Sequence, residues 1–173
     1  MQFIPLEIGG VLGIIGDSHS DSRGTLTRVW DSNPVFQEFA LNQASIVGNP
    51  TKGTLRGLHF QSDPFSETKI IECVSGKVFD VVVDLRKDSS TYGRHLEIEL
   101  GPLEPYIGLF VPAGCAHGYL TLESNSTLIY FMDMTYSVDH SAGLLWSDPK
   151  LSIKWPCKPV LISDRDSEWP LLT

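Results

Sequence analysis

Short apolar runs recur along the chain at nearly regular spacing, and the clearest lie at 69–74 and 77–85. Both runs are rich in β-branched residues, and Ser75-Gly76 separates them. This arrangement predicts a β-hairpin, because glycine readily adopts the positive φ of a tight turn. Polar and apolar side chains alternate over 95–100, which is the two-residue period of a half-exposed strand.

Further strands are expected on both sides of this region. Their predicted ranges are 1–15, 25–30, 43–47, 54–61, 107–111, 118–122 and 127–134, with loops at 16–24 and 48–53. Helical periodicity is scarce before the tail from Trp146, whose prolines indicate short helical turns and loops. Many short strands separated by turn residues predict an all-β double-sheet jelly roll or barrel, with residues 1–173 as a single domain.

Composition narrows the function classes. The 173 residues carry a formal net charge of -8, which argues against non-specific nucleic-acid binding, since that needs a basic face. No apolar run approaches the length of a membrane span and no cationic leader precedes one, so we expect a cytoplasmic protein without a membrane partner. Three cysteines are too few for a disulfide framework, and Cys115 and His117 lack the further ligands of a metal site.

The stretch 54–61, T-L-R-G-L-H-F-Q, is where we expect the chemistry. In a regular strand Arg56 and His59 would point to opposite faces, because successive side chains alternate. A kink at Gly57 would turn Arg56 toward the same pocket as His59. An ordinary half-buried strand with satisfied polar side chains is the alternative interpretation.

Polar residues embedded in strand patterns are further candidates, because a barrel interior favours apolar side chains unless a buried polar group is paired. His59, Lys69, His117 and Tyr130 meet this description. Taken singly, each is better explained as a satisfied core position or a surface side chain. Imidazole titrates near neutrality and a phenol can donate or accept a proton, so the four form a proton-transfer set if they share one cavity.

A resemblance to a known family rests on five ordered segments. They are R-G-L-H-F-Q at 56–61, V-S-G-K-V-F-D-V-V-V-D-L-R-K at 74–87, S-S-T-Y-G at 89–93, P-A-G-C-A-H-G-Y at 112–119 and L-L-W-S-D-P at 144–149. Together they resemble the dTDP-4-dehydrorhamnose 3,5-epimerase family. The resemblance implies a cupin-type jelly-roll barrel, a homodimer, and a nucleotide-sugar substrate with dTDP as the expected nucleotide. It also implies catalysis without a metal or other cofactor.

The resemblance assigns catalytic roles to four positions. His59 matches the family's catalytic base, and Asp166 matches the carboxylate that pairs with it. A carboxylate in that place fixes the imidazole tautomer and stabilises the imidazolium. Lys69 matches the lysine that faces the 4-keto oxygen, where a fixed ammonium stabilises developing negative charge. Tyr130 matches the tyrosine that returns a proton from the opposite face.

The resemblance also implies a set of substrate-binding residues. Arg23 and Arg56 match residues that hold the diphosphate, for which guanidinium offers bidentate donors. Tyr136 matches an aromatic side chain that stacks on the base, although strand-end tyrosines often simply pack with their hydroxyl in water. The remaining members are Gln43, Ser45 and Asn49 in a presumed binding loop, His117 beside the reacting centre, and Arg165 next to Asp166.

Some positions depart from the family pattern. Arg28 and Ser141 stand where family members usually carry acidic residues, and Pro105-Tyr106-Ile107-Gly108 replaces a basic stretch. These departures touch the nucleotide end, so the expected function is inversion at C3, C5 or both of a nucleotide-linked 4-keto-6-deoxyhexose. A catalytically silent sugar-nucleotide-binding cupin and a metal-dependent cupin of other chemistry stay open as alternatives. The sequence lacks the paired H-x-H spacing that a cupin metal site favours, which argues against the metal-dependent alternative.

Overall fold

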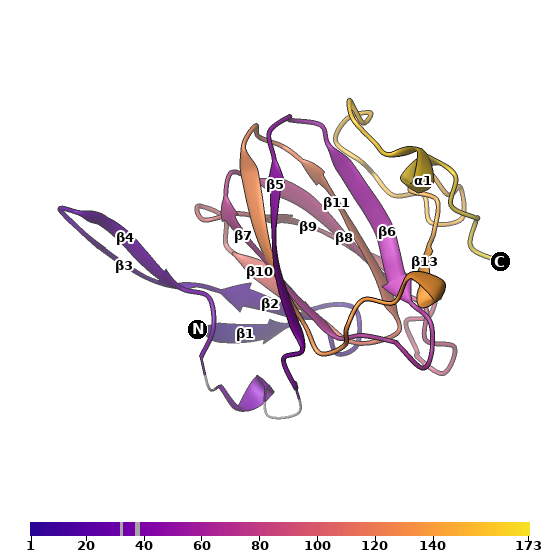
Figure 1. Cartoon of the computed structure of the whole chain (residues 1–173), viewed down its shortest axis with the longest axis horizontal. Coiled ribbons are helices and arrows are strands. Elements are labelled where there is room, and N and C mark those ends of the chain that lie inside the picture. Colours follow the sequence, from indigo (N-terminus) through magenta and orange to yellow (C-terminus); the bar gives the residue numbers. More distant parts are fainter. Residues whose placement is uncertain (32, 37–38) are drawn as a thin grey trace.

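Two antiparallel sheets face each other and form the body of the protein (Figure 1). We describe residues 1–31, 33–36 and 39–173 of the chain from a computed structural model. The larger sheet has the strand order β1-β2-β10-β7-β12-β5 and the smaller sheet has the order β13-β6-β11-β8-β9. A separate two-stranded hairpin, β3-β4, projects away from both sheets (Figure 1).

The strands are short, as the sequence predicts. Those of the larger sheet are β1 (Gln2–Pro5), β2 (Leu12–Ile15), β10 (Gly108–Val111), β7 (Lys69–Ser75), β12 (Ser126–Met132) and β5 (Gln43–Asn49). Those of the smaller sheet are β13 (Ser141–Gly143), β6 (Leu55–Gln61), β11 (Cys115–Thr121), β8 (Val78–Asp84) and β9 (His95–Leu100). The hairpin consists of β3 (Asp17–Asp21) and β4 (Gly24–Arg28). The helical elements are η1 (Pro34–Phe36), η2 (Val138–His140) and α1 (Asp164–Ser167).

The main core lies between the two sheets. Ile71 and Leu128 from the larger sheet pack with Val82 and Tyr119 from the smaller one, and all four are fully buried. Alternation along each strand supplies these inward side chains, since every second residue shares a face. The all-β double-sheet architecture predicted from the sequence is confirmed.

The C-terminal tail covers the outer face of the smaller sheet. Leu58, Val81 and Ala116 form a second apolar cluster there, against which Trp155 and Leu172 pack. The tail then forms α1, beside β6 (Figure 1). The prediction of loops and short helical turns in the tail is therefore confirmed.

Three details of the predicted strands are wrong. The range 1–15 forms two paired strands, β1 and β2, with Gly10 at φ 81° in their connection. The predicted loop 16–24 contains β3, whose polar residues give no apolar alternation to detect. Ser75-Gly76 makes no hairpin, because β7 and β8 belong to different sheets. Gly76 does adopt a positive φ of 72°, and a Cβ there would collide with Ser126.

Membrane-spanning helices are absent from the described residues: none of their helices has the length and apolar character needed to cross a bilayer.

Candidate active site

An irregularity in β6 places Arg56 and His59 on one face. His59 lies opposite His117 of β11, and Arg56 lies opposite Tyr119, so three steps along β6 match two steps along β11. Since His117 and Tyr119 share a face by alternation, the residues opposite them share it too. The predicted kink near Gly57 is confirmed, but the expectation that it turns Arg56 toward the same pocket as His59 is wrong, because the two residues line different cavities.

Gly57 is required for this irregularity. Its φ is 130°, a region that residues with a side chain rarely adopt. A Cβ on Gly57 would lie 2.5 Å from the Cα of Gly118, because the two backbones are in close contact. Any side chain at either glycine would push β6 and β11 apart.

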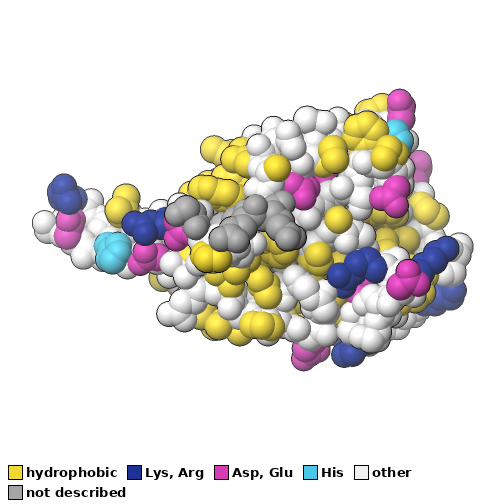
Figure 2. All heavy atoms as spheres, turned by 90° about the horizontal axis from the view of Figure 1, so that it is seen from below, with side chains coloured by type: hydrophobic (Ala, Val, Ile, Leu, Met, Phe, Trp, Pro, Cys, Tyr) yellow, Lys and Arg dark blue, Asp and Glu magenta, His cyan; other side chains and the backbone are white. Residues whose placement is uncertain are grey.

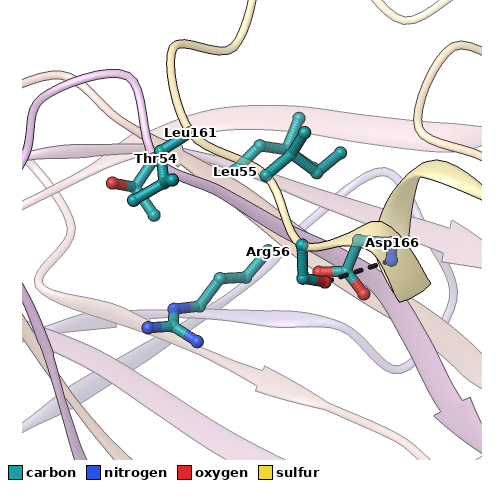
Figure 3. A pocket seen from close by; sticks show the side chains of 7 residues that line it. Thr54, Leu55, Arg56, Leu161 and Asp166 are labelled. Carbon is teal, nitrogen blue, oxygen red and sulfur yellow. Dashed lines mark hydrogen bonds between the residues drawn. The ribbon is translucent and has the colours of Figure 1, made fainter.

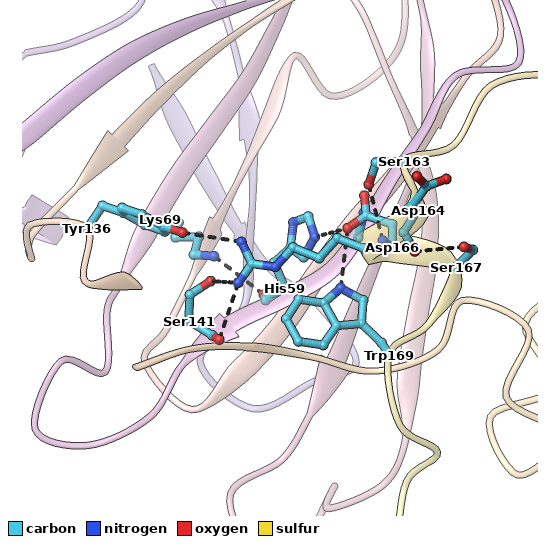
Figure 4. Close-up of polar contacts among 11 residues, drawn as sticks. His59, Lys69, Tyr136, Ser141, Ser163, Asp164, Asp166, Ser167 and Trp169 are labelled. Atoms are coloured by element: carbon cyan, nitrogen blue, oxygen red, sulfur yellow. Dashed lines mark hydrogen bonds and ion pairs between the residues drawn. The ribbon is translucent and has the colours of Figure 1, made fainter. Parts of the chain in front are cut away.

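His59 forms a short hydrogen bond with a residue far away in the sequence. Its Nε2 lies 2.6 Å from Oδ1 of Asp166 in α1. Asp166 is 5% exposed, and it also accepts a hydrogen bond from the backbone N–H of Gly57 at 3.3 Å. A further hydrogen bond comes from Nε1 of Trp169 at 3.2 Å (Figure 4). Ser163 caps α1 by accepting the Asp166 N–H. The helix thus fixes the carboxylate beside the imidazole.

These contacts set the charge of Asp166. Burial alone would raise the pKa of its carboxyl group, but the hydrogen bonds from His59, Gly57 and Trp169 outweigh burial and hold the pKa below its ordinary value. An ionised carboxylate at Nε2 keeps the proton on that nitrogen. The Nδ1 lone pair of His59 is then available to accept a proton.

A cavity of about 250 Å³ brings half of the twelve predicted site residues together. Six of them line it: His59, Lys69, Tyr130, Gln43, Tyr136 and Arg165. His59 comes from the smaller sheet, whereas Lys69 and Tyr130 come from the larger one. The candidate base and the candidate acid therefore belong to opposite walls of the same cavity.

Lys69 lies at the start of β7 with its side chain 8% exposed. Its Nζ lies 2.9 Å from Oε1 of Glu67. It also donates to the carbonyl oxygen of His59 at 3.4 Å (Figure 4). A charged amine held at the cavity wall can interact with a ligand oxygen.

Tyr130 packs beside a second histidine–carboxylate pair. Its ring lies 5.9 Å from that of His117 in an edge-on arrangement, and Nε2 of His117 lies 2.8 Å from Oδ2 of Asp80. Burial, with smaller contributions from Tyr119 and Asp80, raises the pKa of Tyr130 well above its ordinary value. The phenol is therefore protonated at neutral pH. His117 is 3% exposed and lies behind the cavity wall, and it does not line the cavity.

The cavity mouth carries an aromatic and basic cluster. Arg165 donates to the hydroxyl of Tyr136 at 3.3 Å and to Oγ of Ser141 at 2.9 Å, while its guanidinium lies 4.8 Å from the ring centre of Trp169. The hydrogen bond from Arg165 lowers the pKa of the Tyr136 phenol. Tyr136 is 53% exposed, so its ring is accessible for stacking.

The predicted binding loop is a strand. Gln43, Ser45 and Asn49 share one face of β5, and Ser45 lies opposite Tyr130 of β12. Asn49 accepts at Oδ1 from Nε of Arg56 at 3.0 Å and from the hydroxyl of Tyr119 at 3.2 Å. This strand connects the cavity with Arg56.

Arg56 lies in a neighbouring cavity of about 250 Å³, whose other lining residues include Thr54, Leu161 and Asp166. Figure 3 shows its side chain extending away from Asp166. Arg56 is exposed, and apart from its contact with Asn49 its guanidinium can bind an anion.

Arg23 is not near either cavity. It lies in the turn of the β3-β4 hairpin, where Nη2 contacts Oδ2 of Asp21 at 2.7 Å. Figure 2 shows the hairpin as an arm clear of the body, with charged side chains along it. The structure therefore does not bring Arg23 together with the other predicted binding residues of the same chain.

Three site residues escaped the sequence prediction: Asp80, Trp169 and Glu67. Asp80 is a charged residue inside an apolar strand, the same signal that identified His59, so it was detectable. Trp169 and Glu67 lie in irregular segments without periodicity, so no local pattern indicated their partners.

No group of three or more His, Cys, Asp or Glu side chains that could hold a metal ion occurs among the described residues.

Comparison with known proteins places this geometry in a family. The sequence model for dTDP-4-dehydrorhamnose 3,5-epimerase matches residues 5–173. The chain belongs to this epimerase family. A member from Sinorhizobium fredii is 44% identical over 177 residues, covering 99% of this chain and 90% of the relative.

Solved structures of epimerases in the family have the same fold. The Bacillus anthracis dTDP-4-dehydrorhamnose 3,5-epimerase, with TDP and PPi bound, superposes with a TM-score of 0.91 at 34% identity, covering 99% of both chains. The Legionella pneumophila dTDP-6-deoxy-D-glucose-3,5-epimerase, in complex with dTDP-4-keto-L-rhamnose, gives a TM-score of 0.90 at 28% identity and covers 98% of this chain and 92% of that one. The cupin-type jelly roll is confirmed.

Proposed function

We propose that this protein inverts C3, C5 or both of a nucleotide-linked 4-keto-6-deoxyhexose, with dTDP-4-dehydro-6-deoxyglucose as the expected substrate. The observation that carries the proposal is the single cavity lined by His59, Lys69 and Tyr130. Family membership supports it, because the relatives are named as epimerases of dTDP-linked 4-keto sugars. Of the two related structures, the one from Bacillus anthracis holds TDP and PPi, and the one from Legionella pneumophila holds a dTDP-linked 4-keto sugar.

His59 acts as the base. Asp166 keeps the proton on Nε2, so Nδ1 can remove a proton from the carbon next to the 4-keto group. The imidazolium that results is stabilised by the ionised Asp166. The side chain of His59 is 39% exposed, so a substrate can reach it.

Lys69 stabilises the intermediate. Removing a proton α to a carbonyl moves an electron pair onto the keto oxygen and forms an enolate. The ammonium of Lys69, which lines the same cavity as His59, supplies positive charge where that oxygen becomes negative.

Tyr130 returns the proton. Since β6 and β12 belong to different sheets, His59 and Tyr130 approach a sugar ring from opposite faces, which inversion requires. The raised pKa of Tyr130 keeps the phenol protonated until the enolate forms. The resulting phenolate and the imidazolium of His59 then return to their starting states by proton exchange with water.

The nucleotide lies toward the cavity mouth in this proposal. Tyr136 stacks on the base, Arg165 holds Tyr136 in place, and Arg56 binds the diphosphate. Gln43, Ser45 and Asn49 line the path between sugar and diphosphate along β5.

A homodimer completes the diphosphate site. Arg23 lines neither cavity of its own chain, because it lies in the turn of a projecting hairpin (Figure 2). In a dimer this arm would extend to the second copy. Two copies related by a two-fold axis would each lend an arm to the other. The homodimer and the role of Arg23 thus depend on one another.

Solvent deuterium exchange tests the function. The protein is incubated in D₂O with a panel of nucleotide-linked 4-keto sugars, and NMR follows deuterium at C3 and C5 and the appearance of inverted product. We expect exchange and inversion with the dTDP-linked 4-keto-6-deoxyhexose. Binding without exchange across the panel would favour the catalytically silent cupin, and exchange that depends on one added divalent ion would favour the metal-dependent alternative.

A further inference from the structure

Lys69 is accompanied by a second buried charge that the proposed mechanism does not use. Thr68, between Lys69 and Glu67, is held on both sides: its N–H donates to Oδ1 of Asp133 at 2.7 Å, and its carbonyl accepts from the Asp133 N–H at 3.2 Å. The extended chain places the side chains of Glu67 and Lys69 on one face. Both side chains are 8% exposed, and their charged atoms lie 2.9 Å apart.

The carboxylate of Glu67 is fixed through both oxygens. Oε1 contacts Lys69, and Oε2 accepts from Nε2 of Gln61 at 3.2 Å. Gln61 is itself held, because its Oε1 accepts the backbone N–H of Ser137 at 2.7 Å. The anion therefore has a single position, and Glu67 lines the same cavity as Lys69.

The ammonium of Lys69 has three N–H donors. Within the described chain, its hydrogen-bonding contacts are Glu67 and the carbonyl oxygen of His59. One donor is left for a ligand in the cavity. The contacts with Glu67 and with the carbonyl oxygen of His59 thus fix the direction of the third N–H.

Burial works against a charged lysine. Removing an ammonium from water favours the neutral amine, and a nearby anion restores the charged form. Stabilising an enolate needs the charge. The titratable and charged groups that line the cavity with Lys69 are Glu67, His59, Tyr130, Tyr136 and Arg165, and among these Glu67 is the carboxylate.

We propose that Glu67 is a positioning residue for Lys69, which keeps the ammonium charged and directs its free N–H toward the keto oxygen of the substrate. The inference rests on the proposed function of Lys69. It goes beyond that function by assigning a role to a residue that does not itself touch the reacting atoms.

The first test compares pH profiles of deuterium exchange for the wild type, Glu67→Gln and Glu67→Asp. In Glu67→Gln the ammonium of Lys69 loses its counterion. The alkaline fall of kcat should therefore begin at a pH about one unit or more below that of the wild type. KM should change by less than about threefold. Glu67→Asp, which restores the charge, should recover most of the alkaline activity. A merely structural role would lower activity equally at all pH values, and that result would overturn the proposal.

The second test does not depend on activity. NMR of protein labelled with [ε-¹³C]lysine follows the titration of Lys69, whose signal is identified by its absence in Lys69→Met. Glu67→Gln should make Lys69 lose its proton at lower pH than in the wild type. Glu99→Gln is the matched control, because it removes a carboxylate from Lys77 at 2.5 Å on the surface and should shift the Lys77 signal alone.

The outcomes separate the two proposals. An unchanged titration of Lys69 in Glu67→Gln overturns the role of Glu67, even if the wild type exchanges substrate hydrogens normally. A wild type that exchanges none of the panel overturns the proposed function, while the titration still decides whether Glu67 keeps Lys69 charged.

Discussion

The Nε2 atom of His59 lies 2.6 Å from Oδ1 of Asp166, although 107 residues separate the two in the sequence. His59 belongs to β6 in the smaller sheet, and Asp166 belongs to α1 in the C-terminal tail. The tail also contributes Trp169, whose Nε1 donates to the same carboxylate oxygen. The tail therefore completes the proposed catalytic pair in addition to covering the sheet.

Replacing either member of this pair should remove a transition-state interaction and leave most of the ground-state affinity. His59→Ala and Asp166→Asn should each lower kcat by about 10²–10⁴, with nucleotide-sugar binding retained within about an order of magnitude. Since the two act as a unit, the double variant should be no slower than His59→Ala. Stopped-time NMR assays and calorimetric binding measure both quantities. Near-normal turnover in His59→Ala would remove this histidine from the mechanism.

Mixing two inactive variants tests whether Arg23 acts on a second copy. Arg23→Ala and His59→Ala should each be poorly active alone. In a mixed dimer, the subunit with intact His59 receives the intact arm, so equal mixing after unfolding and refolding should restore about a quarter of wild-type activity. If Arg23 served its own chain, every subunit in the mixture would carry one defect and activity would not recover. Sedimentation of the mixture confirms that dimers have formed.

Glu72 should make stability depend on pH. Its side chain is fully buried on β7 opposite Gly108 and Ile129, and both carboxyl oxygens lack a hydrogen-bond partner among the described residues. Desolvation raises its pKa from 4.5 to about 8. At pH values between these two pKa values, the folded state holds one proton more than the unfolded state. The free energy of unfolding therefore falls as pH rises, by about 1.4 kcal/mol per pH unit.

The variant Glu72→Gln removes that dependence. Relative to the wild type, its free energy of unfolding should improve by an amount on the order of 4 kcal/mol between pH 5 and pH 8. A constant cost of burying an amide does not affect this slope. Urea unfolding at four pH values measures it, and parallel curves for the two proteins would contradict the prediction.

Much of the sheet was predictable because buried strands appear as short apolar runs and half-exposed strands as an alternation of polar and apolar residues. β7 and β8 are such apolar runs, and β9 shows the alternation. The strand predicted at 25–30 corresponds to β4, but its partner β3 was hidden because it is polar and exposed and pairs through hydroxyls, such as Ser18 with Thr27 at 2.9 Å. The hairpin predicted at Ser75-Gly76 was wrong because the sequence of a tight turn is the same whether the chain returns within one sheet or crosses to another.

The site divides in a similar way. Residues on strands, such as His59 and Lys69, were visible as polar positions in apolar patterns. Their partners show no such pattern: the family resemblance indicated Asp166, whereas Glu67 was not predicted. Glu67 precedes β7 in an irregular segment, and its role depends on a contact with Gln61 that no local pattern encodes. The placement of Arg23 could not be predicted either, because an unpaired loop and a projecting hairpin have similar composition.

Tyr130→Phe separates proton removal from inversion. The variant keeps His59, Lys69 and the shape of the cavity but lacks the hydroxyl that returns a proton from the wall opposite His59. His59 can still remove a proton, and its imidazolium can return a deuteron to the original face. We therefore expect exchange at C3 or C5 in D₂O to continue while inverted product falls by about 10²-fold or more. If Tyr130 only packs, a phenyl ring fills its space at small cost. NMR reads exchange and inversion from separate signals, so full inversion at close to the wild-type rate would show that Tyr130 is not the acid.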